Sequence, residues 1–294
     1  MDQILQYFKL LESQRKVRIL YLCEFGSRVK GYGREISDYD IVGVFVDDAL
    51  DAYWKREIFP EDVDHITGST EFKVTANDDG NNEHVHVDFA LWHLTKAIRL
   101  LFTKRNYSLL LWCKSTIKYI ELEEFTHFRE FLFNTVQTIR PSVMYGWARN
   151  SCHYCTTQLI HQDENVRRKA LKSILVAWYQ LLMMLLVTEC NTIDTLDMFA
   201  EFRDKKETVF KKWIEFIPAD KREELFGVRK SRESDENIDE STQKLIEELL
   251  KAAENLIGHF DYKLFENNCV GLTFDERWNE EVAQLIKAGL RTSN

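Results

Sequence analysis

LCEFGSRVKGYGREISDYDIVGVFV, residues 22–46, sets a Gly-Ser pair beside a short glycine-bearing turn and then places an Asp-Tyr-Asp triplet in an apolar run. Carboxylates inside an apolar segment are costly unless something positive holds them. β-Branched and aromatic residues dominate Val17–Phe25, which predicts a buried strand, and Asp38–Val46 predicts a second one. The glycines between them favour a turn over a long helix. The stretch therefore predicts two strands joined by a glycine-bearing turn, with acidic side chains on the second strand.

The sequence on either side extends this sheet. Residues 2–16 predict a helix, and residues 47–68 predict a loop. Residues 71–75 and 83–92 then predict a hairpin around a glycine-containing turn. In its second arm Val85, Val87, Phe89 and Leu91 share one face, so Asp88 lies on the other.

After Leu94 the period of the apolar residues becomes helical. Most of 123–217, together with 244–260 and 275–290, predicts helices, whereas the polar segment 227–243 predicts a linker. The composition shifts near residue 120. We therefore expect an α+β domain over residues 1–120 and an α-helical domain over residues 121–294.

The composition limits the classes of protein that fit. The 294-residue chain has a formal net charge of -9, which argues against broad nucleic-acid binding but leaves room for a local basic groove. Its cysteines favour free thiols over a disulfide framework. The N-terminus is unlike a signal peptide, and the longest apolar run, Ser173–Val187, predicts a buried helix. We expect no membrane association and a cytoplasmic or nuclear location.

Three carboxylates predict a metal site. Asp38 and Asp40 stand two residues apart, so on a strand both side chains leave the same face. Side by side they repel, and one of them tends to stay protonated near neutral pH unless a positive charge is near. A divalent ion removes that conflict, and magnesium prefers such oxygen ligands. Asp88, on the polar face of another strand, would complete a site for two ions.

Gly26 and Ser27 predict what this site binds. Glycine lets the backbone approach a phosphate closely. Backbone N–H groups, together with a serine hydroxyl, can bind phosphate oxygens at the start of a helical turn. A phosphate group beside a magnesium site is therefore the expected ligand.

The pattern formed by Phe25, Gly26-Ser27, Asp38-Tyr39-Asp40 and Asp88 resembles that of the DNA polymerase β-like nucleotidyltransferase superfamily. A closer resemblance is to the predicted nucleotidyltransferases of the YcgL/RlaP type, which are associated with RNA repair. FGSRVKGYGREISDYDI and VDFALWHLTKAIRLLFTKRNYSLLLWCKSTIKY carry it, over roughly residues 17–120.

The resemblance implies a mixed-sheet catalytic domain followed by a helical domain. It also implies transfer of a nucleoside monophosphate from a triphosphate, with ATP as the first candidate, to an acceptor hydroxyl such as an RNA end. Two Mg²⁺ ions, with Mn²⁺ as a substitute, would be held by Asp38, Asp40 and Asp88. Candidate nucleotide-binding residues are Gly26, Ser27, Arg28, Lys30, Lys169 and Lys172. For the lysines the alternative is solvated surface charge.

Other interpretations stay open at this point. Lys30, Val42 and Trp178 depart from the residues expected in the family, which leaves a catalytically inactive nucleotide-binding or regulatory module on the same fold as the alternative function. Some residues also suggest a zinc or manganese site, although solvent-facing histidines and buried thiols are favoured. They are His84 and His86 beside Asp88, and the group Cys152, His153, Cys155 and His161.

Overall fold

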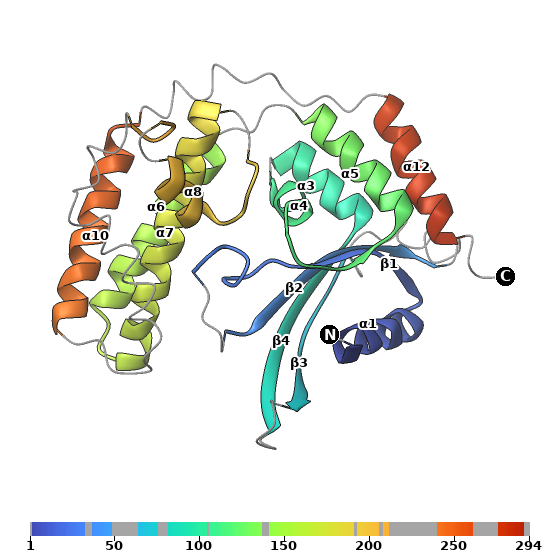
Figure 1. Cartoon of the computed structure of the whole chain (residues 1–294), viewed down its shortest axis with the longest axis horizontal. Coiled ribbons are helices and arrows are strands. Elements are labelled where there is room, and N and C mark those ends of the chain that lie inside the picture. Colours follow the sequence, from blue (N-terminus) through green and yellow to red (C-terminus); the bar gives the residue numbers. More distant parts are fainter. Residues whose placement is uncertain are drawn as a thin grey trace. The chain divides into compact units, whose positions relative to one another are not determined.

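The computed structural model describes residues 2–32, 37–48, 64–75, 82–104, 106–136, 141–190, 193–205, 208–211, 240–260 and 276–290 (Figure 1). Most of the predicted loop 47–68, the hairpin turn and most of the predicted linker 227–243 lie outside these ranges.

The chain forms two compact units. The first comprises Met1–Val29, Glu35–Val136 and Leu272–Asn294, and the second comprises Lys30–Arg34 and Gln137–Gly271. The division differs from the expected boundary at residue 120, because the first unit continues to Val136 and regains the end of the chain.

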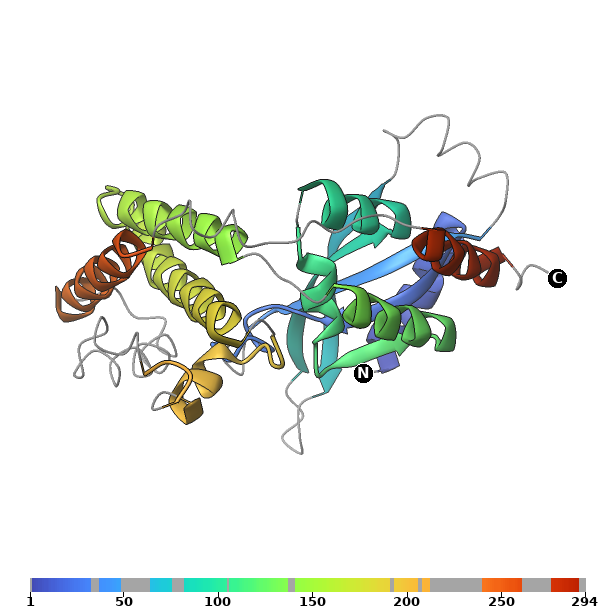
Figure 2. The same cartoon turned by 90° about the horizontal axis from the view of Figure 1, so that it is seen from above.

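Aromatic packing explains why the last helix, α12 (Glu276–Leu290), returns to the first unit. Trp278 is fully buried, and its ring lies 4.6 Å from Phe102, 6.1 Å from Phe128 and 4.8 Å from Phe131, measured between ring centroids. Figures 1 and 2 show α12 beside α5 (Glu123–Thr135). Burial of a Trp side chain is a large favourable contribution to the free energy of folding, so it holds α12 in the first unit although many residues of the helix are polar.

A five-stranded sheet with the order β3-β4-β2-β1-β5 forms the middle of the first unit. Its strands are β1 (Val17–Glu24), β2 (Tyr39–Asp47), β3 (His65–Thr75), β4 (Asn82–His93) and β5 (Lys118–Glu121). β2 and β4 pair in parallel, and the other neighbours pair antiparallel. The predicted α+β fold, with a mixed sheet and a helical part after it, is confirmed.

Helices cover both faces of this sheet (Figure 1). On one face α1 (Asp2–Arg15) packs Phe8 against a core that includes Ile41, Val87, Phe89 and Leu91, so the predicted inward face of β4 is confirmed. On the other face lie α3 (Leu94–Lys104), α4 (Ser108–Cys113) and α5.

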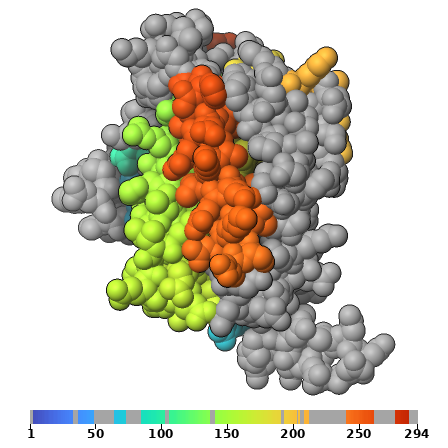
Figure 3. Space-filling view, turned by 90° about the vertical axis from the view of Figure 1, so that its left-hand side faces the viewer, coloured from blue at the N-terminus to red at the C-terminus, as the bar shows by residue number. Residues whose placement is uncertain are grey.

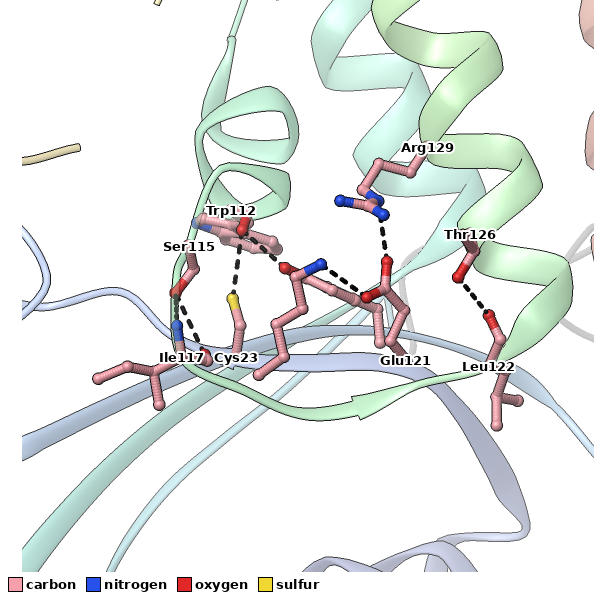
Figure 4. Close-up of polar contacts among 10 residues, drawn as sticks. Cys23, Trp112, Ser115, Ile117, Glu121, Leu122, Thr126 and Arg129 are labelled. Carbon is pink, nitrogen blue, oxygen red and sulfur yellow. Dashed lines mark hydrogen bonds and ion pairs between the residues drawn. The ribbon is translucent and has the colours of Figure 1, made fainter. Parts of the chain in front are cut away.

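Hydrogen bonds fix the end of β1 against α4 and the segment that joins α4 to β5 (Figure 4). Ser115 Oγ donates to the Glu24 carbonyl at 2.5 Å, and the Cys23 thiol donates to the Trp112 carbonyl at 3.5 Å. On β5, Glu121 forms ion pairs of 2.7 and 2.8 Å with the side chains of Lys118 and Arg129. The strand that leads into the Gly-Ser turn is therefore held at its final residue.

The second unit is helical. It contains α6 (Pro141–Leu159), α7 (Glu164–Cys190), α8 (Met198–Lys205) and α10 (Glu240–Gly258). α10 lies along α6 on the face that Figure 3 presents. α7 is long and apolar enough to cross a membrane, but 78% of its apolar window is buried within the protein, as in a core helix. Trp178 of α7 is fully buried and donates to the Leu249 carbonyl at 3.2 Å, so this position has a packing role.

Thiol reactivity should follow this packing. Cys23, Cys113, Cys152 and Cys155 are buried, whereas Cys190 is exposed. Burial raises the pKa of Cys152 and Cys155 to about 12, because a thiolate is poorly solvated there, so both remain unreactive thiols at neutral pH. We expect iodoacetamide to alkylate Cys190 of the folded protein and to spare these four, as measured by peptide mass spectrometry. Modification of Cys155 ahead of Cys190 would contradict this packing.

Candidate active site

Asp40 and Asp88 lie side by side on the parallel strands β2 and β4. The pairing sets Asp40 opposite Asp88 and Ile41 opposite Phe89. Opposite residues on paired strands project to the same face of a sheet, and successive residues alternate between faces. Since Ile41 and Phe89 belong to the core beneath α1, both carboxylates project to the other face. The Asp88 side chain is 54% exposed, so a ligand can reach it from solvent.

Gly26 lies against the Asp40 side chain. The Phe25 N–H donates to the Asp40 carbonyl at 2.9 Å, which extends the pairing of β1 and β2 into the turn. A Cβ atom built on Gly26 would lie 1.6 Å from Asp40 Oδ2, so any side chain at this position would displace the carboxylate or the turn. Glycine is required here because the backbone passes so close to the acid. Ser27, the next residue, is buried.

Asp38 is not part of this aligned pair. It precedes β2, which begins at Tyr39, and its side chain is exposed. Asp88 Oδ1 lies 3.2 Å from His86 Nε2 on the same strand face. Within the described ranges, no three His, Cys, Asp or Glu side chains are grouped closely enough to hold a metal ion. The structure therefore brings together two of the three predicted ligands.

Arg28 is held by a buried carboxylate at the end of β1. Its Nε lies 2.7 Å from Glu24 Oε1, and its guanidinium lies 4.3 Å from the centre of the Tyr39 ring. The other Glu24 oxygen accepts a hydrogen bond from the Tyr119 hydroxyl at 3.1 Å. Burial, reinforced by Glu24, raises the pKa of Tyr119, so the phenol remains a donor.

The Glu24–Arg28 ion pair lies on the sheet face opposite the carboxylate pair. Glu24 is in register with Ile41, and Ile41 alternates with Asp40 along β2. Glu24 and Arg28 flank Gly26-Ser27 in sequence. Their ion pair therefore joins the residues before and after the turn. Arg28 thus has a structural partner in addition to its predicted contact with phosphate.

The predicted lysines belong to the second unit. Lys30 Nζ lies 5.6 Å from the centre of the Tyr179 ring, a cation–π contact. Lys169 and Lys172 are exposed on α7. The first unit, which carries Asp40 and Asp88, does not include them, and their binding of nucleotide stays a prediction.

The residues considered as zinc ligands differ in burial: the cysteines are buried, whereas His153 and His161 are exposed. Cys152 and Cys155 are buried in α6, and the Cys155 thiol lies 3.5 Å from the Ala170 carbonyl. His153 and His161 are exposed, and His86 is the partner of Asp88. The His84 side chain lies outside the described part of the chain.

The aligned pair suits magnesium by its chemistry. Carboxylate oxygens are the ligands that this cation prefers, and it commonly uses one or two of them together with waters and substrate phosphates. Asp40 and Asp88 supply two such groups at directly paired positions of neighbouring strands. The exposure of Asp88 leaves room for waters and phosphate oxygens.

Sequence reasoning missed Glu24 and Tyr39. Glu24 ends a mostly apolar strand four residues before Arg28, and that spacing was a usable signal for an ion pair across the turn. Tyr39 stands at the variable position of the Asp-x-Asp triplet. No pattern in a single sequence predicts that the Arg28 guanidinium packs on the Tyr39 ring.

Of the comparisons with known proteins, the match to a family model shows the family of this chain. The protein YcgL of Bacillus subtilis (strain 168) is 31% identical over 122 residues, which are 41% of this chain and only 39% of YcgL. A crystal structure of a nucleotidyltransferase-like protein from Exiguobacterium sibiricum 255-15 aligns with a TM-score of 0.35 and 12% identity, over 95% of this chain and 87% of that one. The model of the family RlaP, described as the RNA repair pathway DNA polymerase beta family, matches residues 1–175. Because this match covers more than half of the sequence, the chain belongs to the RlaP family of polymerase β-like nucleotidyltransferases.

Proposed function

We propose that the protein is a Mg²⁺-dependent nucleotidyltransferase. It moves a nucleoside monophosphate from a triphosphate, ATP in the first instance, to an acceptor hydroxyl and releases pyrophosphate. The observation that carries the proposal is the alignment of Asp40 with Asp88, with the Gly26-Ser27 turn directly against Asp40. Membership of a polymerase β-like family supports the same class of reaction.

The reaction is one displacement at phosphorus. The acceptor oxygen attacks the α-phosphorus and forms a new P–O bond, while the bond from that phosphorus to the bridging oxygen breaks and pyrophosphate leaves. Asp88 accepts the proton of the hydroxyl, and His86, 3.2 Å away, keeps that carboxylate in place. The N–H groups of the turn and the Ser27 hydroxyl bind oxygens of the leaving phosphates. Catalysis of this kind rests on positioning and charge neutralisation.

Magnesium would bind at the carboxylates. Asp40 and Asp88 would hold it, with Asp38 as a further ligand and a second ion accompanying the nucleotide. When bound, the ion neutralises charge on the phosphate oxygens. Manganese would serve as a substitute because it accepts the same oxygen ligands.

The acceptor that the proposal favours is an RNA end. The description of the family as part of an RNA repair pathway supports this choice. The net charge of -9 favours contact with a short terminal stretch of RNA over a long basic footprint, whose affinity would depend on many phosphate contacts.

Asp40→Asn tests the proposal. The protein is incubated with each α-labelled triphosphate, Mg²⁺ or Mn²⁺ and short RNAs, and both labelled product and pyrophosphate are measured. We expect Asp40→Asn to reduce transfer by about 100-fold or more, because a neutral amide replaces a charged group at the reacting phosphates. Asp163→Asn is the control, since Asp163 is exposed at the start of α7 in the second unit.

The outcomes separate the candidate functions. Unchanged transfer by Asp40→Asn would contradict the assigned site. Wild-type protein that is stabilised by ATP and Mg²⁺ against heat, yet releases no pyrophosphate, would favour the regulatory module. A ligand that binds only the folded state must stabilise it, so the absence of any thermal shift would contradict both.

A further inference from the structure

The strand β3 places a polar side chain beside the carboxylate pair. Ser69 of β3 is in register with Asp88, and Asp88 is in register with Asp40, so the three residues form a row across β3, β4 and β2 (Figure 1). Directly opposite residues of antiparallel strands have Cβ atoms about 4.5–5.5 Å apart, close enough for their side chains to contact one ligand. Ser69 is therefore a neighbour of the carboxylate that accepts the proton in the proposed reaction.

Alternation along β3 shows that Ser69 projects to the same face as the carboxylates. Ile66 is buried in the core beneath α1, and Phe72 packs against that core. The residues that alternate with them therefore project to the other face, where Asp40 and Asp88 lie. Three of these residues, here called the β3 strip, are exposed: Thr67, Ser69 and Glu71. A ligand can reach the strip from solvent.

The strand order places the β3 strip and the Gly26-Ser27 turn on opposite sides of the carboxylate pair. The turn follows β1 and lies against Asp40 of β2, whereas the order of the strands is β3-β4-β2-β1. In a displacement at phosphorus, the attacking and the leaving oxygens lie roughly in line on opposite sides of the phosphorus. The proposed function puts the leaving phosphates at the turn, so the attacking hydroxyl has to come from the β3 side.

We infer that Ser69 is an acceptor-binding residue that recognises the terminal ribose of RNA. This inference rests on the proposed function. When the 3′ hydroxyl attacks, the Ser69 hydroxyl binds the neighbouring 2′ hydroxyl of the same ribose, to which it can donate and from which it can accept a hydrogen bond. The 2′ hydroxyl is the group by which proteins distinguish RNA from DNA. Ser69 thus gives the site a preference for a ribose end over a deoxyribose end.

The charge of the β3 strip favours ribose over phosphate as the group that it binds. Glu71 is in register with His86, which contacts Asp88. The exposed carboxylate of Glu71 repels a phosphodiester but accepts hydrogen bonds from hydroxyl groups. The strip therefore suits the neutral, hydroxyl-bearing part of an acceptor.

Two fluorescein-labelled single-stranded RNAs of the same sequence test this inference. One ends in a ribonucleotide and the other in a 2′-deoxynucleotide, and the Kd of each for the full chain is measured by fluorescence anisotropy in Mg²⁺. We expect the wild type to bind the deoxy-ended RNA about two- to tenfold more weakly, the range for the loss of one neutral hydrogen bond. Ser69→Ala should bind both RNAs with equal Kd values, because the protein partner of the 2′ hydroxyl is gone.

Ser69→Thr and Ser13→Ala are the controls. Threonine keeps a hydroxyl and suits a strand, so Ser69→Thr should retain the preference of the wild type. Ser13 is exposed on α1, which covers the opposite face of the sheet, and Ser13→Ala should retain the preference as well. Substitutions at such exposed positions change stability little. A preference that persists in Ser69→Ala, or a wild type that shows none, would overturn the inference.

Transfer assays separate this inference from the proposed function. The kcat/KM for each RNA and the KM for ATP are measured in the wild type and in Ser69→Ala. We expect Ser69→Ala to lose the preference for the ribose end while its KM for ATP stays within about twofold of the wild-type value, since only acceptor binding is affected. A wild type that transfers to neither RNA would contradict the proposed function, and the Kd values would still decide the role of Ser69. Equal transfer to both ends by the wild type would overturn that role and leave the proposed function intact.

Discussion

Gly26→Ala is expected to remove nucleotidyl transfer while the protein stays folded. The new Cβ would lie 1.6 Å from Asp40 Oδ2 and 2.4 Å from Asp40 Cγ, so the carboxylate or the turn must move. A misplacement of about 1 Å in a catalytic arrangement can cost about 100-fold in rate. Here a proposed metal ligand and the proposed phosphate-binding turn are displaced together. We expect a loss of at least that size in pyrophosphate release at saturating nucleotide.

Gly146→Ala provides the matched comparison. Gly146 lies within α6, and a Cβ built on it meets nothing within 4 Å. The same chemical change should therefore stabilise the protein by about 0.4–1 kcal/mol and leave transfer unchanged. Wild-type transfer by Gly26→Ala would mean that Asp40 does not lie against the turn in solution.

Glu24→Ala is expected to lower the free energy of unfolding by about 2–4 kcal/mol. Glu24 is 1% exposed and is the shared partner of Arg28 Nε and the Tyr119 hydroxyl. Removing one partner of a buried ion pair costs about 3–5 kcal/mol. The Arg28 side chain is 25% exposed, so water replaces part of what it loses and reduces that cost. Urea denaturation followed by circular dichroism measures the difference.

Glu164→Ala is the control for this change. Glu164 and Arg168 have the same four-residue spacing, but their contact is 3.9 Å and their side chains are 42% and 41% exposed. An exposed pair of this kind contributes less than about 1 kcal/mol. If Glu24→Ala lost no more stability than Glu164→Ala, the burial of Glu24 would have no energetic consequence.

The local structure around the turn could be predicted because it depends on neighbours in sequence. β-Branched and aromatic residues set β1, and strict alternation set the faces of β4, where Val87 and Phe89 are buried and Asp88 is exposed. The same alternation placed Asp88 away from the core, and the register of β2 with β4 puts Asp40 beside it.

Features that depend on distant residues could not be predicted in this way. Trp278 belongs to a helix whose sequence fits either unit, and aromatic partners far away in the chain decide its place. Asp38 was expected on the strand, but the pairing of β2 begins one residue later. Gly31 lies against Asp197, beside α8, and Tyr32 packs on Tyr179 of α7, so both partners are more than a hundred residues away in the chain.

The parallel pairing of β2 with β4 has a consequence for how the protein would acquire the proposed activity. The paired residues Asp40 and Asp88 are 48 positions apart (88 − 40), and β4 is the strand that joins β3 to the rest of the sheet. Closing so long a loop costs chain entropy before any contact is made, so this pairing should form late in folding. Partly folded chains would then carry the Gly-Ser turn without the second carboxylate. During refolding from urea, nucleotidyl transfer should be recovered only when the last part of the native structure forms.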